Sequence, residues 1–203
     1  MKMTMKMMMI LSVLHAAGRI GREVASRCRQ GFGMSTIGYD PVLSEAAARA
    51  ADIDLVSLDE LFEKSDFITI HTPLTESTKY LIDAQTLAQC KKGVRIINCA
   101  RGGVVHEGDL LAAVQSGMVG GVSLDTFEVE PPEEASYDLR MHPNVIVTPH
   151  LGASTTDAQV RPGRLPARSQ LQLICVSYRP FICPSHAVNM SLFKNLICIV
   201  GEP

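Results

Sequence analysis

Several features are absent or scarce in this 203-residue sequence, and each absence excludes a class of protein. No apolar run approaches the ~20 residues that a membrane-spanning helix needs. Lysine and arginine are scattered and the net charge is -2, so no basic stripe predicts nucleic-acid binding. The six cysteines form no C-x-x-C pair and no zinc-type spacing. This usage favours reduced thiols in an intracellular, cytoplasmic protein and predicts no metal site.

What the sequence does contain is a regular alternation of short apolar runs and helical patterns between residues 7 and 150. Valine and isoleucine dominate the apolar runs, as in strands that are buried on both faces of a parallel sheet. No internal repeat interrupts the series. The predicted strands cover residues 10–14, 36–39, 67–70, 94–98, 119–124 and 145–147.

Helical patterns fill the intervals between these runs, at residues 20–29, 44–51, 58–64, 83–89 and 107–116. Ser57 stands three residues before Glu60, the spacing of a capping box. Gly93 and Gly117 lie where helix ends are expected. Strand–helix alternation with right-handed crossovers predicts an α/β fold with a doubly wound parallel sheet.

The two ends of the chain differ from its body. Lys2 and Lys6 precede an apolar run, which can be read as a faint signal peptide or as a first strand. We favour the strand, because a glycine turn follows at once. After about residue 159 periodicity fades, and Pro162 stops any helix begun at Ser154. We therefore expect a divergent segment at residues 1–15, a domain at 16–159 and a poorly ordered tail at 160–203. A small added subdomain is the alternative for the tail.

A glycine turn opens the first predicted helix. Gly18 and Gly21 fit two positions of the G-x-G-x-x-G dinucleotide fingerprint, and Ala16 occupies the first. Asp40 follows about twenty residues later, at the end of the next strand, where a carboxylate can bond the ribose of NAD and repel the 2′-phosphate of NADP. The alternative for Asp40 is a turn residue before Pro41. The spacing predicts an NAD site.

Three short stretches after predicted strands carry groups suited to acid–base chemistry. They are residues 98–103, 128–132 and 149–155, and they supply Arg101, Glu130 and His150. An arginine clamps a carboxylate bidentately, a histidine moves protons near neutral pH, and a neighbouring carboxylate orients its ring. The alternatives are a surface arginine, a solvated loop acid and a hydrogen-bonded histidine at a strand end. With a hydride carrier bound nearby, the set suits oxidation of a hydroxy acid.

The ordered set of motifs resembles the NAD-binding domain of the D-isomer-specific 2-hydroxyacid dehydrogenases. The matching stretches are Gly18-Arg-Ile-Gly-Arg-Glu-Val-Ala25, Gly38-Tyr-Asp-Pro41, Asp66-Phe-Ile-Thr-Ile-His-Thr-Pro-Leu-Thr75, Asn98-Cys-Ala-Arg-Gly-Gly103, Leu124-Asp125, Glu130-Pro131 and Pro149-His-Leu-Gly-Ala-Ser-Thr155. They span residues 17–159 and resemble most the branch acting on 3-phosphoglycerate. The resemblance implies oxidation of this 2-hydroxy acid to 3-phosphohydroxypyruvate with NAD, in serine biosynthesis.

The resemblance also implies roles for individual residues. Arg101 holds the substrate carboxylate, His150 is the acid–base group, and Glu130 orients it. The implied NAD-binding set comprises Gly18, Arg19, Ile20 and Gly21 at the pyrophosphate, Asp40 at the ribose, and Thr72, Pro73, Cys99, Ala100, Arg101, Asp125, His150, Leu151, Gly152 and Ala153 around the nicotinamide. For Asp125 a strand-end cap is the alternative, and Cys99 is expected to be a packed thiol.

The chain departs from the family pattern at both ends. Family members carry a substrate-binding domain before the glycine turn, and we expect it to be largely absent here. Three functions therefore stay open: a dehydrogenase, impaired as an isolated chain; a catalytically silent NAD-binding module; and a non-functional truncated isoform. A homo-oligomer, or a mixed oligomer with a full-length enzyme, is the partner expected beside the small-molecule substrate. Neither nucleic acid nor a membrane is expected as a partner.

Overall fold

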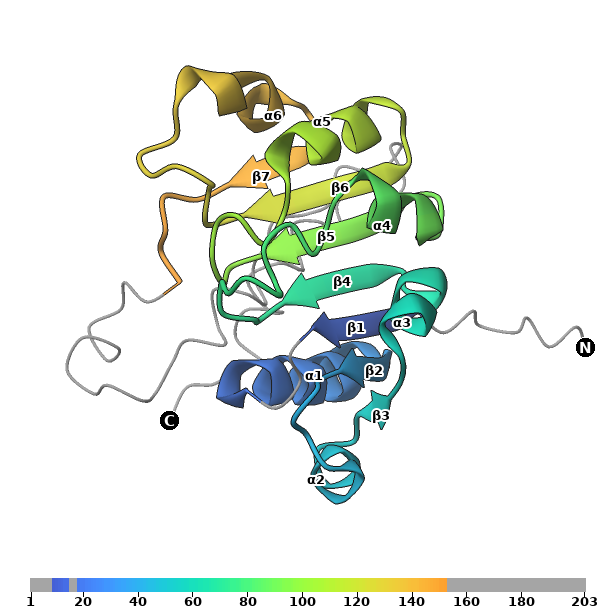
Figure 1. Cartoon of the computed structure of the whole chain (residues 1–203). Helices are drawn as coiled ribbons and strands as arrows, with labels where there is room; N and C mark the ends of the chain where they lie inside the picture. The colour runs from blue at the N-terminus through green and yellow to red at the C-terminus, as the bar shows by residue number, and fades with distance from the viewer. Residues whose placement is uncertain (1–8, 15–17, 153–203) are drawn as a thin grey trace, which may run out of the picture.

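The fold is built on one seven-stranded parallel sheet (Figure 1). The structure, a computed structural model, describes residues 9–14 and 18–152. The strand order is β3-β2-β1-β4-β5-β6-β7, and every neighbouring pair is parallel. The strands are β1 Ile10–Leu14, β2 Ser35–Tyr39, β3 Asp54–Leu55, β4 Phe67–Ile70, β5 Val94–Asn98, β6 Val119–Leu124 and β7 Val145–Val147. The predicted doubly wound sheet is confirmed.

The strand predictions agree closely with the structure, with one omission. Five predicted strands have the observed bounds, and β2 begins one residue earlier than predicted. Strand β3 was not predicted, because it has only two residues at the edge of the sheet and shows no apolar run. The apolar run before the glycine turn forms β1 at the centre of the sheet, as the strand interpretation predicted.

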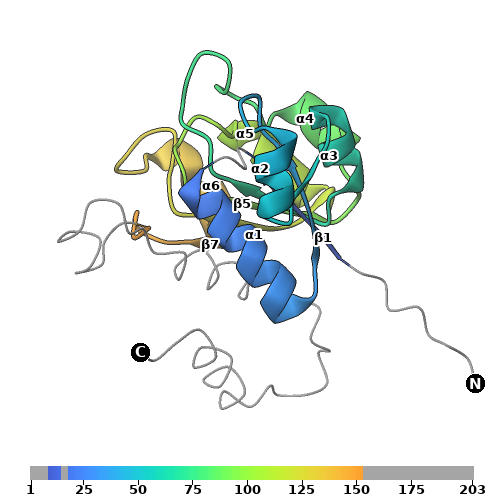
Figure 2. The ribbon, with the colours of Figure 1, turned by 90° about the horizontal axis from the view of Figure 1, so that it is seen from below.

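Helices cover both faces of the sheet (Figures 1 and 2). On one face α3 Leu58–Lys64, α4 Ala84–Gln89, α5 Glu107–Gln115 and α6 Tyr137–Met141 pack on the larger apolar cluster. On the opposite face α1 Arg19–Phe32 packs on β1, β2 and β4 through Val24, Ala25 and Cys28. The short helix α2 Glu45–Ala50 precedes β3 at the sheet edge, and the 3-10 turn η1 Glu134–Ser136 leads into α6.

The helix ends correct some details of the prediction. Helix α1 continues three residues beyond the predicted end and stops at Gly33, whose φ of 63° belongs to the left-handed region. Gly117 follows α5 as predicted, but Gly93 does not end α4: Cys90 caps that helix. Ser57 does accept a hydrogen bond from Glu60 N, at 3.2 Å. Helix α6 and η1 were not predicted, because five and three residues carry almost no periodicity.

The sheet order reverses beside β1, because the chain runs outward to β3 and then crosses back to β4. In parallel sheets, ligands bind beyond the carboxyl ends of the strands at such a switch point. The residues that follow β2, β4, β5, β6 and β7 therefore meet at one edge, and the predicted site residues after the glycine turn that the structure describes lie on these segments. No described helix has the length and apolar character to cross a membrane.

Candidate active site

A histidine–carboxylate pair lies at this edge. His150 Nδ1 is 2.7 Å from Glu130 Oε2, and both side chains keep contact with solvent. The other Glu130 oxygen accepts a hydrogen bond from Phe127 N at 3.1 Å. Partial burial opposes ionisation of Glu130, but the bonds from His150 and Phe127 together with the charge of Arg101 outweigh it. The net effect lowers the pKa of the Glu130 carboxyl.

Ionised Glu130 determines which nitrogen of the His150 ring carries the proton. An ionised carboxylate only accepts hydrogen bonds, so Nδ1 of His150 carries a proton toward Glu130. The predicted acid–base role of His150 would then belong to the second ring nitrogen, Nε2. The structure thus brings together two residues that lie twenty positions apart in the sequence.

Arg101 lies on a turn that Asn98 organises. The Asn98 side chain donates to Arg101 O at 2.9 Å and accepts from Ala100 N at 3.0 Å. Asn98 is buried at the end of β5, whereas Arg101 is exposed and its Nη1 donates to Ala100 O at 2.6 Å. Sequence reasoning gave no role to Asn98. A signal was present in the sequence: an asparagine at the end of an apolar run often bonds to nearby backbone.

The Arg101 turn and the Glu130 loop touch through backbone. A Cβ built on Gly102 would lie 1.7 Å from the carbonyl oxygen of Phe127 and 2.3 Å from its carbonyl carbon. Only a glycine therefore fits at residue 102. This contact joins the segment that carries Arg101 to the residue whose N–H binds Glu130, so the two charged groups are placed relative to each other by main chain.

The cofactor side of the edge begins at α1. Gly18 precedes this 14-residue helix without a capping side chain, and the first turn holds no acidic residue. A helix start of this kind suits the phosphates of a dinucleotide. Asp40, buried at the end of β2, accepts from Val42 N at 2.8 Å and Leu43 N at 3.0 Å, so its turn role is present. Ribose binding by Asp40 remains a prediction.

The remaining predicted residues lie around the ends of β4, β5 and β6. Thr72 is buried and donates to Pro73 O at 3.2 Å, while Pro73 is exposed. Burial raises the pKa of the Cys99 thiol and nearby Asp125 raises it further, so Cys99 stays a protonated thiol and is a poor nucleophile. Ala100 is half-buried in the Arg101 turn. Ala16 and Ala153 lie outside the described residues, as does the predicted tail at 160–203.

The Asp125 carboxylate binds the segment on which His150 stands. Leu151 N donates to Asp125 Oδ1 at 2.8 Å and Gly152 N donates to Oδ2 at 2.7 Å. The Thr148 hydroxyl also donates to Oδ1. Sequence reasoning offered a nicotinamide contact or a strand-end cap for Asp125. Its observed partners belong to the loop after β7, and the nicotinamide contact stays a prediction.

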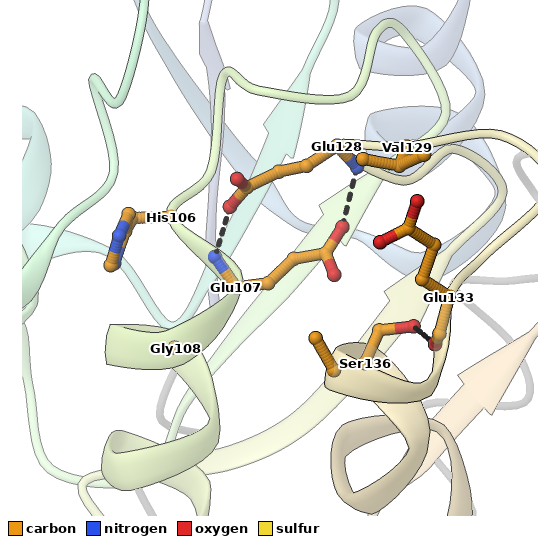
Figure 3. Close-up of a pocket in the computed structure, with 8 residues that line it drawn as sticks. His106, Glu107, Gly108, Glu128, Val129, Glu133 and Ser136 are labelled. Carbon is orange, nitrogen blue, oxygen red and sulfur yellow. Dashed lines mark hydrogen bonds between the residues drawn. The ribbon is translucent and has the colours of Figure 1, made fainter.

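Two glutamates bind each other's backbone beside the site (Figure 3). Glu107 N donates to Glu128 Oε1 at 2.7 Å, and Glu128 N donates to Glu107 Oε1 at 2.5 Å. The pair attaches the start of α5 to the loop that continues to Glu130. Burial raises the pKa of the Glu107 carboxyl, and the Glu128 charge adds to this effect. Within residues 9–14 and 18–152, no cluster of histidine, cysteine or acidic side chains suits a metal ion.

Replacing Glu107 by glutamine is expected to stabilise the protein at neutral pH. A carboxyl whose pKa is raised by folding destabilises the folded state once the pH exceeds its unfolded pKa, near 4.3. Glutamine keeps an oxygen for Glu128 N and removes the charge. Denaturant unfolding from about pH 3 to pH 7 measures this: the advantage of the variant is expected to grow as the pH rises.

Glu107→Ala is the matched control for this prediction, because it removes both the charge and the oxygen that Glu128 N needs. It is expected to be less stable than the parent chain at low pH, where charge plays no part. A Glu107→Gln variant whose stability relative to the parent does not change with pH would contradict the assignment.

Comparison with known proteins identifies the family to which this arrangement belongs. A family model described as D-isomer specific 2-hydroxyacid dehydrogenase, NAD binding domain, matches residues 9–152. The chain belongs to this family. NAD is therefore the cofactor of the domain, in agreement with the prediction, and the uncapped start of α1 and the polar strand ends fit it.

Several similar proteins are dehydrogenases. The chain is 55% identical over 146 residues to D-3-phosphoglycerate dehydrogenase of Rattus norvegicus. This match covers 72% of the chain and 27% of that protein. The holo structure of D-mandelate dehydrogenase from Rhodotorula graminis matches with a TM-score of 0.70 at 33% identity, covering 74% of this chain and 44% of that one. D-lactate dehydrogenase from Aquifex aeolicus, complexed with NAD and lactic acid, matches with a TM-score of 0.69 at 31% identity, covering 85% and 54%.

Proposed function

We propose that this chain carries the NAD-binding side of an oxidoreductase active site that oxidises a 2-hydroxy acid, with 3-phosphoglycerate as the substrate and 3-phosphohydroxypyruvate as the product in serine biosynthesis. The observation that carries the proposal is the 2.7 Å contact between His150 Nδ1 and Glu130 Oε2, close to the charge of Arg101. The identity to D-3-phosphoglycerate dehydrogenase supports the choice of substrate. Because the chain spans 27% of that relative, the activity of the whole protein is part of the proposal.

Each of the three predicted catalytic residues has its own role in the proposed reaction. Arg101 binds the substrate carboxylate and places the hydroxyl-bearing carbon near the nicotinamide. His150 Nε2 takes the hydroxyl proton, and Glu130 stabilises the imidazolium that forms. Bound NAD would supply the hydride acceptor, so that the substrate would lose one proton and one hydride and become a 2-oxo acid. We propose that the NAD-binding residues named in the sequence analysis, of which Gly18 is the first and Ala153 the last, together hold the cofactor.

The proposal includes a cellular compartment and an oligomeric state for this protein. We place the protein in the cytoplasm, where thiols such as those of Cys90 and Cys99 stay reduced. We also propose a homo-oligomer, or a mixed oligomer with a full-length dehydrogenase. In the mixed oligomer the alternative role of this chain is that of a catalytically silent NAD-binding module.

Calorimetric titration of the chain with NAD and an assay of NADH formation from 3-phosphoglycerate test the proposal. We expect NAD binding, and a turnover that His150→Gln reduces by about 10²–10⁴-fold, the usual contribution of a general base. His142→Gln is the matched control, since His142 caps a turn before β7 by accepting from Asn144 N, and it should leave turnover intact.

Three other results are informative. No NAD binding at millimolar cofactor would overturn the proposal and leave a chain with neither dehydrogenase activity nor cofactor binding. NAD binding without NADH formation would overturn the dehydrogenase and leave the silent module. Turnover that is unchanged in His150→Gln would remove His150 from the chemistry.

A further inference from the structure

The Asp125 carboxylate is buried and accepts hydrogen bonds from the protein itself. Asp125 follows β6 directly and is 2% exposed. Its two oxygens accept three hydrogen bonds, from Leu151 N at 2.8 Å, from Gly152 N at 2.7 Å and from the Thr148 hydroxyl. A carboxylate offers about four acceptor positions, so most of its capacity is already spent inside the protein.

All three donors come from the five residues around His150. Thr148 precedes it by two positions, and Leu151 and Gly152 follow it at once. His150 itself has a φ of 52°, in the left-handed region that non-glycine residues rarely adopt. A left-handed residue turns the next N–H groups toward one point, which is how backbone nests bind anions. Here the anion is the side chain of Asp125.

The fit around this carboxylate is close. A Cβ built on Gly152 would lie 3.0 Å from Asp125 Oδ2, which is tighter than most real contacts. Asp125 N also donates to Asn98 O at 2.9 Å, which fixes Asp125 to the strand end that organises the Arg101 turn. The backbone of Asp125 is therefore bonded to the sheet, and its carboxylate binds the loop that carries His150.

We propose that Asp125 is the positioning residue of His150: its carboxylate holds the backbone at 148–152 in the one conformation that lets the His150 ring meet Glu130. Glu130 orients the ring, and Asp125 places the backbone from which that ring extends. For its catalytic meaning the inference rests on the proposed function, but the positioning itself is a property of the chain alone. It differs from the role that the family resemblance implies, which is a contact with the nicotinamide.

The test follows the His150 ring by nuclear magnetic resonance. Long-range ¹H–¹⁵N correlation of the histidine rings at about pH 8, where an ordinary histidine is neutral, distinguishes a proton on Nδ1 from one on Nε2. The parent chain is expected to show His150 with the proton on Nδ1, bonded to Glu130. Asp125→Asn, which replaces one of the two accepting oxygens by an NH2 group that only donates, is expected to lose this signal.

Two controls keep the experiment decisive. Asp83→Asn makes the same chemical change at the cap of α4, away from the site, and should leave the His150 signal as in the parent. Thr148→Val removes one donor and keeps the shape of the side chain. It is expected to shift part of the His150 population to the Nε2 tautomer, and it decides the matter if Asp125→Asn does not fold.

A folded Asp125→Asn protein that keeps the parent signal overturns the proposal, as does a Thr148→Val protein without any shift if only that variant folds. A parent chain without the Nδ1 signature overturns it as well. Failure of the proposed function is seen separately, in the NAD titration of the parent chain: a chain that binds no NAD but loses the His150 signal in Asp125→Asn retains the positioning role and lacks the function.

Discussion

Gly102→Ala is expected to separate Arg101 from Glu130 and to destabilise the domain. The new methyl group would stand 1.7 Å from Phe127 O and 2.9 Å from Glu128 N, and both are backbone atoms that cannot rotate away. One of the two loops must move. Overpacking in a close-packed region costs about 1–3 kcal/mol, and a collision with backbone belongs at or above the upper end of that range.

Thermal unfolding and the His150 ring signal measure this prediction together. For a domain of this size, about 3 kcal/mol lowers the melting temperature by roughly 6–12 °C. Movement of Phe127 also weakens its hydrogen bond to Glu130, so the proton on His150 Nδ1 should become less populated.

Gly31→Ala is the matched control, because a Cβ at Gly31 in α1 meets no atom within 4 Å. It should raise stability by about 0.5–1 kcal/mol, as alanine does in a helix. A Gly102→Ala protein as stable as the parent, with its His150 signal unchanged, would show that the loops are not in contact.

Phe67→Ala is expected to cost about 3–5 kcal/mol, the usual loss for a buried phenylalanine. Phe67 begins β4 between β1 and β5, is 0% exposed, and belongs to the smaller apolar cluster under α1. Its ring also lies 5.1 Å from the Arg95 guanidinium carbon, so alanine leaves a cavity and removes a cation–π contact. Against a typical total of about 5–15 kcal/mol, this loss is large.

Chemical denaturation of the parent and variant chains measures that loss. Phe32→Ala is the matched control, since Phe32 at the end of α1 is 39% exposed and leaves no closed cavity. Its cost should be below about 1 kcal/mol, in the range of surface changes. Equal losses for the two variants would contradict the assignment of Phe67 to the core.

The fold was predictable because most of its strands are visible as apolar runs in the sequence. Strands buried on both faces, such as β4 and β5, require unbroken apolar runs, and such runs are visible in the sequence without any knowledge of the partners. Strand β3 and helix α6 were not visible, because each is too short for periodicity to accumulate. Their positions depend on what they pack against.

The site was predictable in part. The sequence indicates that Arg101, Glu130 and His150 follow strand ends, and parallel strands bring those ends to one edge. It does not indicate that Gly102 meets Phe127, since that contact joins residues 25 positions apart through backbone atoms common to every residue. The same holds for Asp125, whose partners become apparent only when the loop after β7 folds back over β6.

The backbone contact at Gly102 has a consequence for how such a site can be altered. A continuous series of covalent bonds and short contacts runs through Arg101, Gly102, Phe127, Glu130 and His150. The fold therefore sets the distance between the backbone of Arg101 and that of His150. Moving either group would break that series. Under the proposed function, a redesign for a longer or shorter hydroxy acid therefore has to change residues outside this series and leave the series itself unaltered.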